Sequence, residues 1–215
     1  MADAVKMTVN ELPTLTYNFL RVNRAELEAE GLRGSSDPRT VISGETEGVI
    51  IRRGVSRAEI AERVSAVRER ISRMDSDPEN VPPNGDTSDR HSDQLIRTGL
   101  GIDVDRLMDS EDVPFILIET EPGADIEEPV FLTDGGSGEE TVLSRRFIHV
   151  KKGSRLTVAC ECSREQLRMF GSQTLVLVEE GAELRLSGVQ MCGADTLFFD
   201  DTGVICLKGA SVSVT

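Results

Sequence analysis

The C-terminal half of the chain alternates apolar and polar residues in a nine-residue pattern that occurs three times. The copies are VKKGSRLTV (150–158), VEEGAELRL (178–186) and CLKGASVSV (206–214), and their central glycines are 28 residues apart. The residues three and five positions after each glycine are apolar, and those between are polar, so the apolar set lies on one face of a strand. The glycine marks a tight corner between two short strands, which favours a residue that tolerates positive φ.

A fourth and weaker copy, ILIETEPGADI, places Gly123 thirty residues before Gly153 and puts Ile118 and Ile126 on the inward face. Short strands, one corner per copy and a period near 28 are typical of a solenoid whose coils stack like on like. A β-sandwich also alternates, but it has no reason to keep one register over four copies. We therefore predict a mainly β fold, a right-handed parallel β-helix, in which an interior ladder contains Val150, Val178 and Cys206.

Helical periodicity is strongest in the first third of the chain. The segment ELPTLTYNFLRVNRAELEAEGL (11–32) has apolar residues at helical spacing and Gly31 as a stop. A short strand follows at 49–51. The clearest helix then begins at Ser56, which forms a capping box with Glu59, while Val55 and Ile60 form a hydrophobic staple. Its apolar stripe, which packs against the core or against a partner, consists of Ile60, Val64, Val67, Ile71 and Met74.

These patterns divide the chain into a helical N-terminal region (1–74), a flexible acidic and proline-rich linker (75–93) and the β-helix (94–215). The linker contains almost no apolar residues, so it cannot bury enough surface to offset its ordering entropy, and we expect His91 within it to be solvated. A short helix around residues 100–108 leads to Pro114, after which strands and turns follow. The last inward residue stands one position before Thr215, without a polar cap. We expect either that a partner covers this face or that the β-helix is incomplete at its C-terminus.

Composition excludes several classes of function. The net charge of −14 over 215 residues disfavours nucleic acid and anionic membranes as partners. No run of about 18 apolar residues is present, and the N-terminus lacks the apolar core of a signal peptide. Four cysteines without disulfide-type spacing fit a reducing cytoplasm. With no Trp and one Tyr, the chain offers no stacking surface for single-stranded nucleic acid.

The cysteines carry the main candidate chemistry. Cys160 and Cys162 in ACECS are alternate strand residues, so their thiols face the same way and either pack in the interior or handle sulfur, iron or zinc. Cys206 replaces valine in the ladder, which favours packing. Cys192, in QMCGAD at an expected corner, is the better candidate for a reactive thiol.

Other polar motifs favour structural roles. His149 takes the position of a leucine in the next coil, which favours a buried, hydrogen-bonded histidine over a metal ligand. The segment DGGSGEE (134–140) lacks the lysine and following helix of a phosphate loop and is typical of a turn. We expect Asp125, Glu127 and Glu128 to form a solvated face. No nucleophile elbow, metalloprotease motif or dinucleotide fingerprint is present, so no enzymatic activity is predicted.

The segments LPTLTYNFLRVN, FIHVKKGSRLTV and LVLVEEGAELRL together resemble the SufB/SufD family, the scaffold subunits of the SUF iron–sulfur cluster assembly system, and most of all its shorter SufD-like members. The resemblance covers most of the chain. It implies a right-handed parallel β-helix between helical ends, pairing with a second SufB/SufD-like subunit or with itself through that helix, and binding to the ABC-type ATPase SufC. It also implies that the protein hydrolyses nothing and holds an iron–sulfur cluster only transiently.

The chain departs from the family where it stops. The later coils and C-terminal helices of the family, with their cluster-linked Cys or His, lie beyond Thr215. Cys160, Cys162 and Cys192 are positional candidates for a sulfur-relaying cysteine, because no motif fixes which of them corresponds. Two other readings are open. A structural or protein-binding β-solenoid would need no cluster, and a secreted polysaccharide lyase would need a groove of outward carboxylates and basic residues, which the sequence does not contain.

Overall fold

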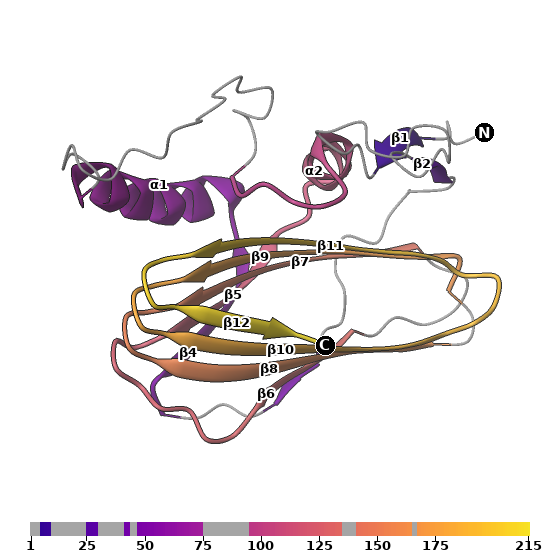
Figure 1. The fold of residues 1–215 in the computed structure, drawn as a ribbon. Helices are drawn as coiled ribbons and strands as arrows, with labels where there is room; N and C mark the ends of the chain where they lie inside the picture. The colour runs from indigo at the N-terminus through magenta and orange to yellow at the C-terminus, as the bar shows by residue number, and fades with distance from the viewer. Residues whose placement is uncertain are drawn as a thin grey trace, which may run out of the picture.

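The computed structural model describes residues 5–9, 25–29, 41–43, 47–74, 95–134, 141–164 and 167–215. Two facing five-stranded sheets form a β-solenoid of about three turns, with two helices against the outer face of one sheet (Figure 1). That sheet, here the covered sheet, contains in order β11 (Leu197–Cys206), β9 (Met169–Val178), β7 (Thr141–Val150), β5 (Phe115–Thr120) and β4 (Val49–Val55). The second sheet contains β12 (Ser211–Val214), β10 (Glu183–Cys192), β8 (Arg155–Arg164), β6 (Val130–Asp134) and β3 (Val41–Ser43).

The predicted ladder is confirmed in its register and in the burial of its two valines, but the predicted interior packing of Cys206 is wrong. Strands β5, β7, β9 and β11 pair in parallel, and the register places Val150 beside Val178 and Val178 beside Cys206. The two valines are fully buried, whereas Cys206 is exposed because no described strand pairs with β11 on its other side. Ile118 and Ile126 belong to the same interior cluster, as predicted. The 28-residue period therefore corresponds to one coil of the solenoid.

The repeated glycines form the corners between the two sheets. Gly123, Gly153, Gly181 and Gly209 all have φ between 66° and 75°, a conformation that disfavours any side chain. The corners also bond to one another: the Gly153 amide donates to the Glu180 carbonyl at 3.0 Å, and the Gly181 amide to the Lys208 carbonyl at 3.1 Å. One corner in the same conformation therefore stacks on the next.

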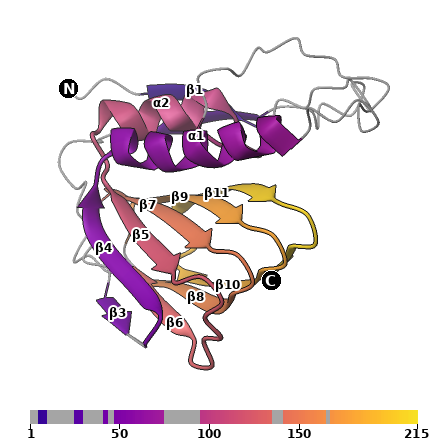
Figure 2. The same cartoon turned by 90° about the vertical axis from the view of Figure 1, so that its left-hand side faces the viewer.

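Two strands from the N-terminal region close the first coil. β4 pairs antiparallel with β5, and β3 pairs antiparallel with β6, so each sheet begins with a strand that runs against the rest (Figure 2). The strand predicted at 49–51 is confirmed within β4. The division at residue 74 misses this arrangement, because β3 and β4 precede the long helix in sequence but are part of the solenoid sheets.

The helix predicted over 11–32 is wrong in its last part. Residues Ala25–Ala29 form strand β2, which pairs antiparallel with β1 (Val5–Val9). In this segment alanine, leucine and alanine alternate with two glutamates, so an alternating pattern overrides the helical spacing upstream. Met7 lies opposite Leu27 in the register, and both pack with the cluster under the second helix. The rest of 11–32 lies outside the described residues.

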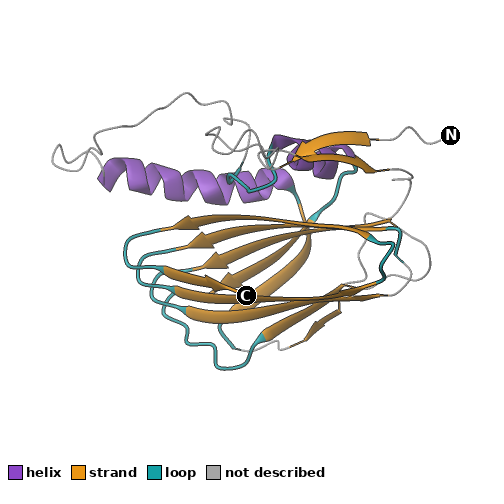
Figure 3. Cartoon of the chain, turned by 45° about the vertical axis from the view of Figure 1, so that its right-hand side comes forward, coloured by secondary structure: helices purple, strands orange, loops and turns teal. Residues whose placement is uncertain are grey.

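The two predicted helices near the solenoid are confirmed. α1 (Arg57–Met74) and α2 (Ile102–Ser110) lie over the covered sheet (Figures 1 and 3). The α1 stripe is buried at Ile60, Val64 and Val67 against aromatic and aliphatic side chains of the sheet, while the side chains of residues 71–74 lie outside the described set. α2 buries Val104, Leu107 and Met108 against Leu143, Met169, Phe199 and the β1–β2 pair. As a result, every residue of β7 and β9 is buried.

The start of α1 has half of the predicted capping box. The Glu59 amide donates to the Ser56 hydroxyl at 3.3 Å, but the Glu59 carboxylate pairs with Arg52 and Arg63 instead of turning back to the cap. Val55 and Ile60 are both buried in one cluster, as the hydrophobic staple predicts. The predicted linker (75–93) with His91 lies outside the described residues, as do residues 135–140 of the predicted turn.

Candidate functional site

A band of polar side chains crosses the otherwise apolar interior of the solenoid. Every second residue of β7 faces inward. Val150, Ile148 and Val142 are apolar, whereas Arg146 and Ser144 between them are polar. The next coils place hydroxyl and carboxyl groups at the same register: Ser172, Thr174, Asp200 and Thr202. Cys160 and Asp134 face this band from the second sheet.

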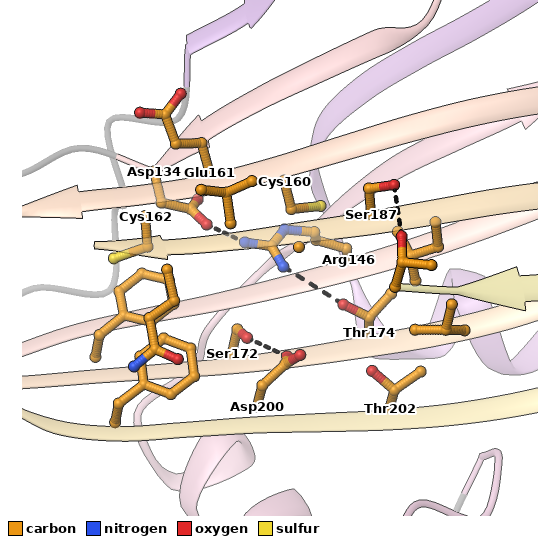
Figure 4. A pocket seen from close by; sticks show the side chains of 18 residues that line it. Asp134, Arg146, Cys160, Glu161, Cys162, Ser172, Thr174, Ser187, Asp200 and Thr202 are labelled. Atoms are coloured by element: carbon orange, nitrogen blue, oxygen red, sulfur yellow. Dashed lines mark hydrogen bonds and ion pairs between the residues drawn. The ribbon is translucent and has the colours of Figure 1, made fainter. Parts of the chain in front are cut away.

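These groups line a cavity of about 260 Å³ between the two sheets (Figure 4). The cavity lies beside the last coil, where β12 pairs with Glu183–Leu186 of β10 and no described strand pairs with the remainder of β10 on that side. Its lining therefore includes Gly188 and Gln190 of β10 and also Thr215. This cavity is our candidate functional site.

The cation in the cavity is already paired. Arg146 and Asp134 form an ion pair with side-chain exposures of 4% and 1%, and the Ser144 hydroxyl donates to the same carboxylate at 3.3 Å. Burial opposes the charge of Arg146, but the Asp134 carboxylate and further acidic groups outweigh burial and raise its pKa. One Arg146 amino group also donates to Thr174 at 3.4 Å, while its Nε has no hydrogen-bond partner among the described residues. With Asp200 nearby, the lining is not suited to a strongly anionic ligand.

Coil stacking brings together two of the three cysteines singled out from the sequence. The Sγ atoms of Cys162 and Cys192 are 3.3 Å apart, with Cys162 buried and Cys192 half-buried at the end of β10. Cys160 and Cys162 both face inward, as predicted, but Cys160 lies toward Arg146 and not toward the thiol pair. Cys206 is exposed on the last coil. The two cysteines in contact therefore come from successive coils, and the two cysteines of ACECS do not contact each other.

Burial keeps the Cys160 and Cys162 thiols protonated at neutral pH. It raises the pKa of Cys160, and burial together with the contact to Cys192 raises the pKa of Cys162 to about 12. A thiolate, and not a thiol, is the nucleophile and the metal ligand. Among the described residues, no group of three or more His, Cys, Asp or Glu side chains is arranged to hold a metal ion. Within the described residues, the thiol pair thus supplies at most two of the four ligands of a tetrahedral site.

No protein-family model, curated protein or solved structure matches this chain. The resemblance to the SufB/SufD family consequently stays a prediction that rests on the quoted segments. In the part of the chain that the structure describes, no helix is both long enough and apolar enough to cross a membrane.

A second polar cluster joins α1 to the covered sheet. The His149 ring lies between two carboxylates, with Nδ1 3.0 Å from Glu119 and Nε2 3.0 Å from Glu179. Ionised carboxylates only accept hydrogen bonds, so the doubly protonated ring is the form that donates to both. Arg70 of α1 also donates to Glu179 at 2.7 Å. His149 is thus buried and hydrogen-bonded, as predicted, and its contacts are those of a structural residue.

The hydrogen bond from His149 lowers the pKa of Glu119 to about 2, against the opposing effect of burial and with further help from Lys151. Burial also opposes ionisation of Glu179, but Arg70 and then His149 outweigh it and lower its pKa. Both carboxylates therefore stay charged over the whole neutral and mildly acidic range. The cluster fixes the helix on the sheet without offering a free acid or base.

Sequence reasoning missed the polar band and the column of outward polar residues under α2. Arg145, Gln173 and Asp201 are register neighbours on the outer face of β7, β9 and β11, and Arg145 also pairs with Asp109 of α2 at 2.6 Å. The alternation of inward and outward residues along each strand was sufficient to predict both the inward polar band and the outward polar column. Counting by twos from the interior ladder assigns Arg146 to the inside and Arg145 to the outside.

Asp125, Glu127 and Glu128 are exposed, as predicted, and Asp125 makes a surface ion pair with Arg155 at 3.4 Å. These carboxylates have solvent on their outer side and no buried cation beside them. They belong to the solvated surface of the second sheet and not to the candidate site.

Proposed function

We propose that this protein is a non-catalytic scaffold subunit for iron–sulfur cluster assembly in a SUF-type system. It would work in the cytoplasm with a SufC-like ATPase and a second SufB/SufD-like subunit or another copy of itself. The proposal takes the solenoid to be right-handed, as in the family that the sequence resembles. The single observation that supports it most is the contact of Cys162 with Cys192, which gives the chain two inward thiols 3.3 Å apart beside a cavity.

The fold agrees with this proposal at a coarse level. A parallel β-solenoid with helices before it is the architecture that the resemblance implies, and the strongly acidic composition disfavours nucleic acid or an anionic membrane as the partner. Iron and sulfide would be cargo, held transiently in the assembled complex. Two thiols complete only part of a cluster's ligand set, so the proposal requires further ligands from a partner subunit or from the cargo itself.

Because burial raises the pKa of Cys162 to about 12, loading of iron has to expel the thiol proton. We therefore expect iron retention by these thiols to increase with pH between 7 and 9. A site built from carboxylates alone would already be ionised at pH 7 and would not show this increase.

Anaerobic reconstitution tests the proposal. The purified chain, with and without the SufC-like ATPase and second subunit, would be incubated with ferrous iron and sulfide, and charge-transfer absorbance and bound iron would be measured. Replacing Cys162 and Cys192 with Ser should remove the absorbance, whereas replacing Cys160 and Cys206 should leave it unchanged. Equal iron content in both double variants, or no binding to the ATPase, would eliminate the assembly role.

One observation favours the alternative, a protein-binding β-solenoid without a cluster. The outer face of the second sheet carries three largely exposed apolar side chains, Phe131, Val189 and Met191, with exposures of 48%, 51% and 53%. They share this face because each alternates with inward residues of β6 and β10. If replacing Phe131 and Met191 with Ser weakens partner binding while no variant ever holds iron, this alternative is preferred.

A further inference from the structure

We propose that Cys162 and Cys192 form a reversible redox pair, which closes to a disulfide between successive coils when the chain meets an oxidised low-molecular-weight thiol such as glutathione disulfide. Their Sγ atoms are already in contact at 3.3 Å, so the bond needs an approach of about 1.3 Å to the usual S–S length near 2.05 Å. The inference does not depend on the proposed function, since it needs neither iron nor a partner.

The surroundings of the two thiols favour closure between them and not with the other cysteines. Cys162 lies in β8 and Cys192 at the end of β10, and both side chains pack in one small apolar cluster with Phe170 and Phe198. The two phenyl rings stack with their centroids 5.5 Å apart. Well-packed neighbours restrict the thiols to the arrangement in which they touch. Cys160 lies instead beside the Arg146–Asp134 pair, and Cys206 lies exposed on the last coil.

Differences in exposure set the order of the chemical steps. The half-buried Cys192 is reached first by the oxidant: its thiolate attacks one sulfur of the disulfide, forms a mixed disulfide and releases one glutathione thiolate. Cys162, which is only 5% exposed, then gives up its proton to solvent, and its thiolate attacks the Cys192 sulfur, which releases the second glutathione. Two protein thiols are oxidised, and one glutathione disulfide is reduced to two thiols.

Closure would covalently join the neighbouring parallel strands β8 and β10, and so two successive coils, close to the C-terminal ends of these strands. The bond would also remove both thiols from any role in binding iron or sulfur.

Tryptic mapping of the full chain tests the pair, provided that the other two cysteines are first replaced. Cys160 shares the peptide 156–164 with Cys162, and Cys206 shares the peptide 186–208 with Cys192. The test protein is therefore the Cys160→Ser/Cys206→Ser variant, reduced, freed of reductant and incubated with a series of ratios of glutathione to glutathione disulfide. We expect a cross-linked 156–164/186–208 peptide, the loss of two hydrogen atoms from the intact mass and full reversal by dithiothreitol.

Two single-thiol variants complete the experiment. Adding Cys162→Ala to the test protein should leave a mixed disulfide with glutathione on Cys192 that does not progress, and adding Cys192→Ala should leave Cys162 unmodified under the same conditions. The proposal is overturned if the two-cysteine protein itself stops at the mixed disulfide, or keeps both thiols at high oxidant while its circular dichroism is unchanged. It is also overturned if fragmentation of the cross-linked 156–164/186–208 peptide from the wild-type chain places the bond on Cys160 or Cys206 instead, a readout that does not rely on any variant folding.

Discussion

Replacing Arg146 with Met is expected to cost about 3–5 kcal/mol of folding free energy, because it leaves the Asp134 carboxylate buried without its cation. Asp134 is 1% exposed, so its charge is stabilised by protein groups and hardly by bulk solvent. The Ser144 hydroxyl still donates to this carboxylate, but at 3.3 Å, near the long end of the hydrogen-bond range, and it offsets little of the loss.

The double variant Arg146→Met/Asp134→Leu distinguishes the effect of a buried charge without its ion-pair partner from a general loss of core packing. Exchanging a whole buried ion pair for apolar side chains is often neutral or stabilising. The free energy of unfolding of the double variant should therefore lie within about 1 kcal/mol of the wild-type value or exceed it. Arg155→Met is the matched control, because Arg155 is 66% exposed and its pair with Asp125 contributes at most about 1 kcal/mol. Urea unfolding followed by circular dichroism measures all three. The reasoning fails if Arg146→Met is as mild as Arg155→Met, or if the double variant is destabilised as much as Arg146→Met.

Three further predictions test the packing and the charge cluster. Gly171→Ala should destabilise the chain by about 1–3 kcal/mol in urea unfolding, because a Cβ there would meet the Phe199 ring within 2.8 Å, whereas Gly188→Ala, with nothing within 4 Å, should be nearly neutral. The Glu119 charge contributes to folding stability in full above its ordinary pKa of 4.5, and this contribution is lost as the pH falls toward about 2. Glu119→Gln should therefore reduce the fall in the urea midpoint between pH 5 and pH 3. An unchanged fall would contradict this role of Glu119. His149→Leu introduces the residue found at this position in the next coil and removes the donor that Glu119 and Glu179 share. It should lower the urea midpoint at pH 7. An equal or higher midpoint would show that the ring contributes only its volume.

The solenoid was predictable because its signal is repeated. Each of four corners needs a glycine at positive φ, and each coil must present apolar residues to the coils above and below it, so the spacing of 28 residues follows directly from the stacking. The β1–β2 pair has no such repetition. Its five-residue strands acquire their shape from pairing with each other and packing on α2, contacts that a local pattern does not contain.

The candidate site was predictable in part. Strand alternation places Cys160 and Cys162 on the inner face, and the corner near Cys192 was evident from the residues that follow it. Which thiols touch depends on the length of the turn between coils and on side-chain directions at the strand ends, and neither is encoded in spacing alone. The sulfur atom of Cys162 therefore meets Cys192, from a different coil, and not its neighbour two residues away.

The stacked corners fix the number of residues in each coil, so the fold depends on length changes occurring in whole coils. A duplication of residues 169–196 would add one strand to each sheet and present every neighbour with the same edge as before. An insertion of one residue within a strand would instead turn valines outward and bring arginine and glutamate into the interior from that point to the next corner. Changes of length in whole coils are thus the route by which such a protein can grow or shrink over evolutionary time, while its strands tolerate exchange of side chains far better than slippage.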